Sequence, residues 1–265
     1  MKDIYNYIDE NIEEYVSDLQ ELIRKPSVSA QNIGLEECAE FVKSQMHKDG
    51  LPAELHEIPG GPPLVFGHLK SSLSKKTLFC YSHYDVQPPE PIEKWSHGGP
   101  WSGALVNNVI YGRGATDNKG GLLAFNKAAK AFLKVRGEVP LNLKFFYEGE
   151  EEIGSVHLGP WVENNKKLLE ADGMHCLDGT VDTFAKVPEV ELGLKSVLFI
   201  ELIARGGSKD IHSLNFPLVP SPPWEIVHAL STIMTRDRKI LIKDWYEGLY
   251  ELGEEEINLL NEKNE

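Results

Sequence analysis

The sequence has few cysteines: three in 265 residues, at Cys38, Cys80 and Cys176. They lie far apart and form no CxxC pair, which argues against a disulfide framework and against a zinc site built from thiolates. We therefore expect an intracellular protein in which all three cysteines are small, buried apolar residues.

The sequence also lacks a long apolar run. No segment reaches the roughly 18 consecutive apolar residues that a membrane-spanning helix needs. Residues 1–16, MKDIYNYIDENIEEYV, carry acids where a signal peptide would need an apolar stretch. The sequence thus predicts a cytoplasmic protein without a membrane partner.

Basic residues are in the minority, with 27 Lys and Arg against 41 Asp and Glu and a net charge of −14. The basic residues are scattered along the chain, so no patch is predicted that would attract a phosphate backbone or an anionic membrane. Nucleic acid is therefore excluded as a partner. The hydrophobic share of 41% is ordinary for a globular protein and is enough for one large domain or two modest ones.

The first third of the chain is predicted to form two helices and then strands. Apolar residues recur at helical spacing over 3–24 and stop at Pro26, which predicts one long amphipathic helix. A second helix is predicted over 35–48. Strand-like runs follow at residues 53–58, 63–69 and 76–86. The third run is almost continuously apolar, which is typical of a buried parallel strand.

A loop rich in proline and tryptophan covers residues 87–101. It is too rigid in composition for a linker and too long for a simple turn, so we expect a lid or a pocket wall. A helix over 121–135 and a strand over 141–147 come next. This alternation predicts an α/β fold with a mixed sheet flanked by helices.

The pattern changes near residue 193. An isolated strand is predicted over 195–207, a helix over 224–234, and a short acidic helix within 251–265. One strand and two helices cannot close a core of their own. We therefore expect residues 1–192 to form one domain and residues 193–265 to form the start of an incomplete α+β domain.

The stretch YEGEEEIGS, Tyr147–Ser155, places four carboxylates in five positions. Runs of this kind usually lie on a solvated face. This run, however, follows the predicted strand over 141–147 directly. The acids are then at the carboxyl end of a strand, where ligands bind in open α/β sheets. This position favours chemistry over simple solvation.

Three further candidates lie at strand ends or before a helix. His83 and Asp85 are two residues apart at the end of a strand, so both point to the same side. Asp117 lies in YGRGATDNKGG, whose glycines fit neither a Walker A loop nor GxGxxG. Asp178 follows another short strand in GMHCLDGT. A structural histidine, a helix cap and a turn aspartate are the respective alternatives.

Taken together, these positions predict a metal site. His83, Asp117, Glu152 and Asp178 supply imidazole and carboxylate ligands from strand ends or the loops after them. This donor set suits a hard or borderline divalent metal such as zinc and needs no thiolate.

The blocks SHYDVQP, YGRGATDNKGG and YEGEEEIGS, in this order and spacing, resemble those of a dinuclear-zinc family of exopeptidases and deacylases. That family includes carnosinase-like dipeptidases, carboxypeptidase G, aminoacylase, succinyl-diaminopimelate desuccinylase and acetylornithine deacetylase. The motifs HYDVQP and EGEEEIGS are most similar to those of the dipeptidase branch. The resemblance implies a metallopeptidase with two Zn2+ ions, with Co2+ or Mn2+ as alternatives, that acts on a small peptide or an N-acyl amino acid. It also implies that residues 1–192 form a catalytic, metal-binding domain and that residues 193–265 begin a lid domain, through which a homodimer is allowed.

The resemblance implies a role for each candidate ligand. His83 and Asp178 would hold one zinc ion, Glu152 would hold the other, and Asp117 would bridge the two. It also implies a cis peptide bond between Asp117 and Asn118.

The resemblance further implies three catalytic roles. Glu151 would be the general base that takes a proton from a zinc-activated water, and Asp85 would orient His83 through its second ring nitrogen. His212, in KDIHS, would stabilise the oxyanion. Relatives commonly continue with a Gly-Gly turn, whereas this chain reads LNFPLVPSPPW, so a structural loop histidine is the alternative.

Relatives of this kind also run well beyond 265 residues and supply a late histidine for the metal held by Glu152, which this sequence does not contain. From this we expect a fragment with weak or absent turnover. N-acyl amino acid deacylation and a non-catalytic remnant or interaction module remain open as alternatives to peptide hydrolysis.

Overall fold

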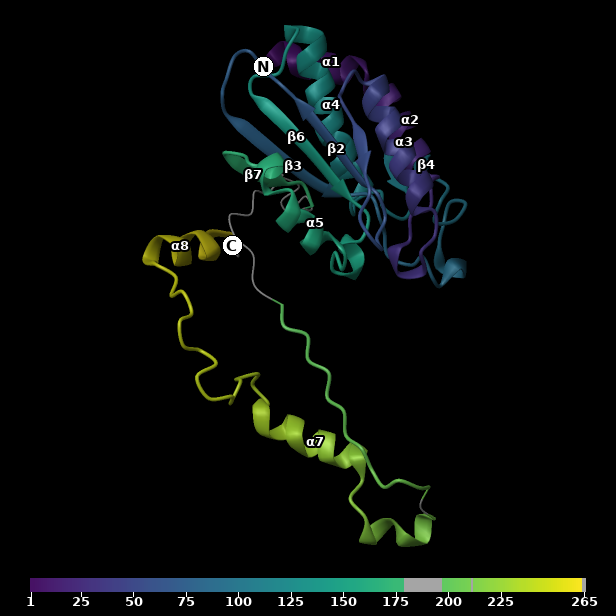
Figure 1. The fold of residues 1–265 in the computed structure, drawn as a ribbon, viewed down its shortest axis with the longest axis vertical. Coiled ribbons are helices and arrows are strands. Elements are labelled where there is room, and N and C mark those ends of the chain that lie inside the picture. Colours follow the sequence, from purple (N-terminus) through teal and green to yellow (C-terminus); the bar gives the residue numbers. More distant parts are fainter. Residues whose placement is uncertain (179–196, 211, 264–265) are drawn as a thin grey trace. The chain divides into compact units, whose positions relative to one another are not determined.

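The computed structural model describes residues 1–178, 197–210 and 212–263, and Figure 1 shows the course of the chain. Its contacts divide the chain into two compact units, Met1–Gly193 and Leu194–Glu265, which are described separately. The assignment of these two parts as catalytic and lid domains remains a prediction.

The first unit is built on a mixed sheet of five strands in the order β1-β2-β6-β3-β7. The strands are β1 (Glu54–His56), β2 (Leu64–Leu69), β3 (Thr77–His83), β6 (Asn142–Glu148) and β7 (Gly173–Cys176). β3 runs parallel to both β6 and β7, whereas β1–β2 and β2–β6 are antiparallel pairs. β4 (Ala104–Val106) and β5 (Val109–Tyr111) form a separate antiparallel ribbon. The predicted α/β fold with a mixed sheet is confirmed.

Helices cover both faces of the sheet. They are α1 (Lys2–Glu10), α2 (Ile12–Ile23), α3 (Leu35–Lys48), α4 (Lys119–Arg136), α5 (Leu158–Asn164) and α6 (Lys166–Leu169). Alternation along β6 explains the two layers, because successive side chains of a strand point to opposite faces. Phe145 and Tyr147 pack in the core with α2, α3 and α4, whereas Phe146 packs with Trp161 of α5.

The prediction of one continuous helix over 3–24 is wrong, because this segment forms two helices, α1 and α2, separated at Asn11. The side-chain Nδ2 of Asn11 donates to the Tyr7 carbonyl at 2.7 Å, and its backbone N–H bonds to Ile8. A short amide side chain competes with the helical backbone in this way. The predicted helix over 35–48 is confirmed as α3.

The expectation of three buried cysteines is wrong for one of them. All three are free, and Cys38 and Cys80 are buried, but Cys176 is exposed. The reason is its place in β7, which lies at the edge of the sheet among the described strands and has all four residues exposed, whereas Cys80 lies in the interior strand β3.

The second unit contains η4 (Ser213–Leu218), α7 (Pro222–Ile233) and α8 (Glu254–Lys263). The two helices confirm those predicted over 224–234 and within 251–265, and Pro222 fits the first turn of α7 because that position needs no N–H donor. The strand predicted over 195–207 is wrong for its described part, since residues 197–207 form no ladder with any described neighbour. Residues 195–196 lie outside the described residues.

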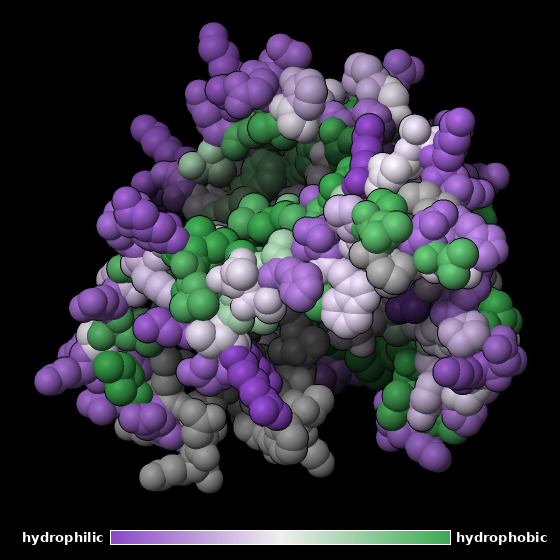
Figure 2. Space-filling view, turned by 90° about the horizontal axis from the view of Figure 1, so that it is seen from below, coloured by the Kyte–Doolittle hydropathy of each residue, from purple (hydrophilic) through white to green (hydrophobic). Residues whose placement is uncertain are grey.

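Apolar side chains of the second unit remain exposed within the part of the chain that the structure describes. Phe199 is 93% exposed, and Leu214 and Leu218 are each 82% exposed. Figure 2 shows apolar side chains of the protein in green among hydrophilic ones in purple. Among the described helices, none has the length and apolar character that crossing a membrane would require.

Candidate metal centre

Parallel pairing brings three strand ends together. In the ladder between β3 and β6, His83 pairs with Glu148, so the residues after both strands emerge at the same edge. β7 lies parallel on the other side of β3, and Asp178 follows it by two residues. The carboxyl ends of parallel strands meet at one edge of an open α/β sheet, which is where ligands bind.

Asp117 arrives from the loop before α4. Gly114 takes a left-handed φ of 84° in this loop, and its carbonyl accepts the N–H of Lys119. The peptide bond between Asp117 and Asn118 is cis, as the family resemblance predicted. Lys119 is fully buried and its Nζ donates to the carbonyls of Leu22 and Lys25, which ties the loop to the end of α2.

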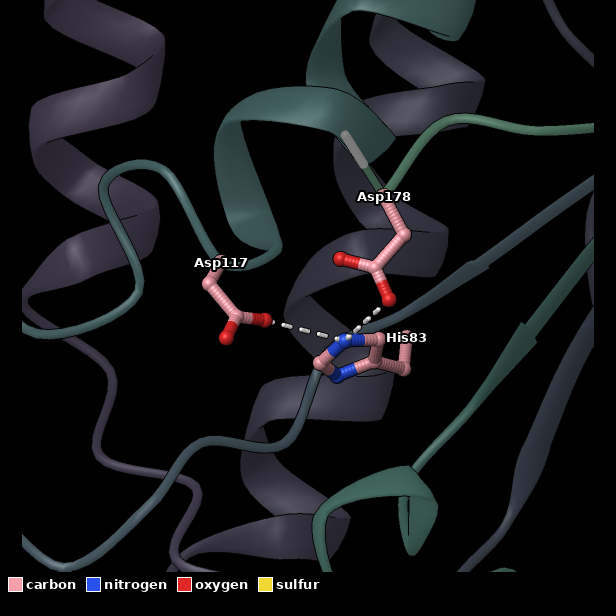
Figure 3. Close-up of side chains that lie close together, drawn as sticks. All are labelled: His83, Asp117 and Asp178. Carbon is pink, nitrogen blue, oxygen red and sulfur yellow. Dashed lines mark ion pairs between the residues drawn. The ribbon is translucent and has the colours of Figure 1, made fainter. Parts of the chain in front are cut away.

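Three of the four predicted ligands converge on one point (Figure 3). His83 Nε2 lies 3.2 Å from Asp117 Oδ1 and 3.6 Å from Asp178 Oδ2. One donor atom from each of the three residues lies within 4.8 Å of the other two. His83 is completely buried, and its Nε2 makes no hydrogen bond within the described residues. A buried nitrogen that faces two carboxylates without a hydrogen bond fits a divalent cation.

Negatively charged carboxylates surround the His83 imidazole. Burial by itself lowers the pKa of the imidazole, but the nearby carboxylates of Asp178 and Asp85 outweigh it and raise the pKa to about 11. Burial raises the pKa of the Glu151 carboxyl, and the neighbouring His83 opposes this rise. The carboxylates thus stabilise a positive charge on the imidazole in this metal-free state, and a bound metal cation would provide that positive charge instead.

Asp85 contacts His83, but its carboxylate has a second set of partners. His83 Nδ1 lies 3.3 Å from Asp85 Oδ1 and 3.1 Å from the backbone carbonyl of Asp85. The two carboxylate oxygens accept the backbone N–H groups of Glu151, at 3.2 Å, and Glu152, at 3.1 Å. Sequence reasoning missed these two bonds. They depend on the parallel pairing of β3 with β6, which local sequence patterns do not contain.

Glu151 and Glu152 lie in the short turn η3 (Glu151–Ile153), which Gly154 ends with a φ of 86°. Glu151 Oε2 faces the cluster and lies 3.8 Å from His83 Nε2. The carboxylate of Glu152 instead bonds to Gln87, at 2.8 Å from the Gln87 side-chain nitrogen. Burial raises the pKa of Glu152 and the Gln87 bond opposes the rise, while the charge of Asp117 adds to it. The structure thus gathers Glu151 with three of the predicted ligands and holds Glu152 beside them.

His212 belongs to the second unit. It is exposed, and its Nδ1 accepts the backbone N–H of Leu214 at 3.2 Å. Because the two units are described separately, its proposed contact with the substrate remains a prediction.

A second acidic cluster in the first unit is not a metal site. Glu14, Asp18 and Asp49 also bring carboxylate oxygens within 4.8 Å of one another. Lys127 Nζ, however, bonds to Asp18 and Asp49, and Lys130 Nζ bonds to Glu14 and Asp49. A third lysine, Lys48, bonds to Asp18. The lysines already neutralise these acids, so the cluster is a structural ion-pair network.

A family model and individual known proteins both match this chain. A protein-family model described as "Peptidase family M20/M25/M40" matches residues 79–248, more than half of the chain. The chain is 33% identical over 265 residues to the Cys-Gly metallodipeptidase dug1 of Schizosaccharomyces pombe, an alignment that covers 94% of this chain and 55% of that protein. It is 28% identical to the human Beta-Ala-His dipeptidase, with 97% and 54% covered.

Solved structures agree with the sequence matches. The chain is similar to the M20 family metallo-carboxypeptidase Sso-CP2 of Sulfolobus solfataricus, with a TM-score of 0.81 and 36% identity over 94% of this chain and 56% of that one. The corresponding values for human carnosine dipeptidase 1 are 0.72 and 28%, over 97% and 57%. The chain spans about half the length of the curated relatives it matches.

Proposed function

We propose, since the chain belongs to peptidase family M20/M25/M40, that it carries the metal-binding site of a hydrolase that cleaves the amide bond of a dipeptide or small peptide. The observation that carries the proposal is the convergence of His83, Asp117 and Asp178 on one point with Glu151 beside them. The dipeptidases and the carboxypeptidase among the similar proteins support the substrate class.

The donor set fits zinc. His83 and Asp178 would hold one ion, Asp117 would bridge, and Glu152 would take part in holding a second, with Co2+ or Mn2+ as alternative metals. Bound zinc supplies two kinds of help to hydrolysis, because it polarises a carbonyl oxygen and lowers the pKa of a water molecule toward about 7.

The chain itself supplies the proton transfers. Glu151 projects toward the cluster and is partly buried, so its carboxylate is suited to accept a proton from the attacking water. The same carboxyl group then returns the proton to the leaving amine. Asp85 orients the site by bonding to the backbone of Glu151 and by facing His83. In our proposal, His212 stabilises the oxyanion from the second unit, and a homodimer through that unit remains a prediction.

A second candidate is hydrolysis of N-acyl amino acids with the same metal core. It is favoured by a match of 34% identity over 169 residues to the succinyl-diaminopimelate desuccinylase of Methylorubrum extorquens, which covers 60% of this chain and 41% of that protein. A panel of dipeptides and N-acyl amino acids offered to the same preparation separates the two substrate classes.

The direct test is metal binding by the purified chain. We expect it to bind zinc, and we expect His83→Ala to lower the zinc affinity at least about 100-fold, because that change removes the nitrogen ligand. His47→Ala is the matched control, since His47 is exposed in the last turn of α3 and lies outside the cluster. Calorimetric titration gives the affinity, and equal zinc binding by both variants would refute the assignment of the site.

A cleavage assay then addresses the reaction. Where the zinc-loaded chain cleaves a dipeptide, Glu151→Gln should retain zinc and lose cleavage by about 10²–10⁴-fold, the usual contribution of a general base. Retained cleavage in Glu151→Gln would remove Glu151 from the role of base without affecting the ligand assignment.

A further inference from the structure

Gln87 makes three hydrogen bonds to Glu152, although the proposed reaction gives it no role. Its backbone N–H donates to Glu152 Oε1 at 3.1 Å, and its side-chain Nε2 donates to Glu152 Oε2 at 2.8 Å. The same Nε2 donates to the backbone carbonyl of Glu152 at 3.0 Å. One glutamine thus holds both carboxylate oxygens and the main chain of one glutamate.

The position of Gln87 follows from the extended chain after β3. In an extended segment, every second side chain points to the same side. His83 faces the metal cluster, Asp85 binds the amides of Glu151 and Glu152, and Gln87 binds the carboxylate of Glu152. The side chains on one side of this segment therefore hold the backbone of the turn η3 and the side chain of Glu152.

The other side of the same segment is held by packing and by a backbone hydrogen bond. Val86 is completely buried, its N–H donates to the Ser27 carbonyl at 2.9 Å, and it forms a bridge with Val28. Gln87 is thus attached to a part of the chain that packing and hydrogen bonds hold in place, so its amide can act as a fixed point for Glu152.

We propose that Gln87 is a positioning residue that sets the place of the Glu152 carboxylate before any metal binds. The inference rests on the proposed function for the identity of Glu152 as a ligand. Each carboxylate oxygen has two acceptor positions, so accepting one bond from Gln87 leaves room for a cation. A ligand already held in place loses less conformational freedom on binding, and outer partners of this kind are typically worth 10–100-fold in metal affinity.

The first test uses the metal-free chain and amide hydrogen exchange. The N–H at position 87 donates to Glu152, so its exchange rate reports on where that carboxylate is. We expect Gln87→Ala to speed exchange at position 87 about 10-fold after correction for intrinsic rates. Glu152→Ala gives the rate with no carboxylate present. Exchange at position 87 that does not change in Gln87→Ala would overturn the proposal.

Two further variants sharpen this test. Gln87→Glu keeps the size of the side chain but replaces the donor with a second negative charge, so it should give the same acceleration or a larger one. Gln31→Ala is the matched control, because Gln31 is an exposed glutamine whose Nε2 donates to the carboxylate of Glu90 at 3.3 Å. It should leave exchange at position 87 unchanged.

The second test measures zinc affinity in the unchanged chain and the same four variants by calorimetric titration. Gln87→Ala should weaken the part of the affinity that depends on Glu152 by about 10-fold, and Gln31→Ala should have no effect. A loss in Glu152→Ala without any loss in Gln87→Ala would overturn the positioning role. If Glu152→Ala itself binds zinc normally, the ligand assignment in the proposed function fails, while the exchange experiment still decides whether Gln87 holds Glu152.

Discussion

At the scale of single residues, Asp85 joins the two halves of the site. Its carboxylate lies between His83, which ends β3, and the amides of Glu151 and Glu152, which follow β6. The imidazole has an alternative acceptor, because the backbone carbonyl of Asp85 lies closer to Nδ1 than the carboxylate does. The two amides have no such alternative among the described residues, so the glutamate turn depends more strongly on Asp85 than His83 does.

Asp85→Asn tests this dependence. Asparagine keeps one acceptor oxygen and places an NH2 group against the other amide, so one N–H loses its acceptor at a cost of about 1–3 kcal/mol. We expect exchange of the Glu151 or Glu152 amide to rise about 10-fold, with the amides inside β6 unchanged. Asp9→Asn, at an exposed position in α1, is the control. Equal protection of both amides in Asp85→Asn would show that another group holds the turn.

The individual residues also show what the sequence could and could not predict about the site. His83, Asp117 and Asp178 could be grouped because each follows a strand or precedes a helix in a recognisable block. The bonds of Asp85 and Gln87 to the glutamates could not, because they join positions 65–67 residues apart and depend on the pairing of β3 with β6. Local patterns do not contain that pairing.

At the scale of secondary structure elements, Lys119 connects α4 to α2. Its ammonium group is fully buried and donates to the carbonyl of Leu22, near the end of α2, and to that of Lys25, just beyond it. The last carbonyls of a helix have few partners within the helix, and the Leu22 carbonyl also accepts the backbone N–H of Lys25. Burial lowers the pKa of Lys119, and carbonyl oxygens rather than a carboxylate are its hydrogen-bond partners. This contact fixes the beginning of α4, two residues after Asp117.

Lys119→Met should destabilise the fold by about 1–3 kcal/mol, because the change leaves the Lys25 carbonyl without the Lys119 donor and removes one of the two donors to the Leu22 carbonyl. Urea unfolding followed by circular dichroism measures this effect. The control is Lys134→Met in the same helix, at an exposed position, where a change below about 0.5 kcal/mol is expected. Equal stability of the two variants would mean that the contact of Lys119 adds little to the fold.

Elements with strong local patterns were predicted well, and those that depend on context were not. The apolar spacing of α3 and the alternation along β6 were visible in the sequence. The division at Asn11 was not, because one polar side chain competes with helical hydrogen bonds that the surrounding apolar spacing favours. A strand also needs a partner, which is why the β-forming composition of residues 197–207 was not sufficient for a ladder among the described residues.

At the scale of the whole molecule, the ion-pair network of Asp18, Asp49 and Lys127 links α2, the end of α3 and α4. Burial alone would raise the pKa of Asp18, but its bonds to Lys127 and Lys48 outweigh it and lower the pKa below 3.8. A carboxyl with a lowered folded-state pKa stabilises the fold above its unfolded value and loses this contribution as the pH falls through the folded value.

Stability should therefore decrease as the pH falls below about 4, and part of the decrease should come from Asp18. Urea midpoints between pH 6 and pH 3 measure the decrease. In Asp18→Asn the overall stability should be lower and its dependence on pH in this range shallower than in the unchanged protein. A dependence of unchanged steepness in Asp18→Asn would place the acid-sensitive groups elsewhere.

The pairing of His83 with Glu148 in the ladder between β3 and β6 has a consequence for misassembly. A register shift of one residue reverses the faces of a strand, so Ser82 or Tyr84 would occupy the position from which His83 reaches the cluster. Neither side chain offers an imidazole nitrogen. A wrongly registered sheet would then be unable to bind zinc there, and zinc affinity would serve as a check on whether the strands had assembled correctly.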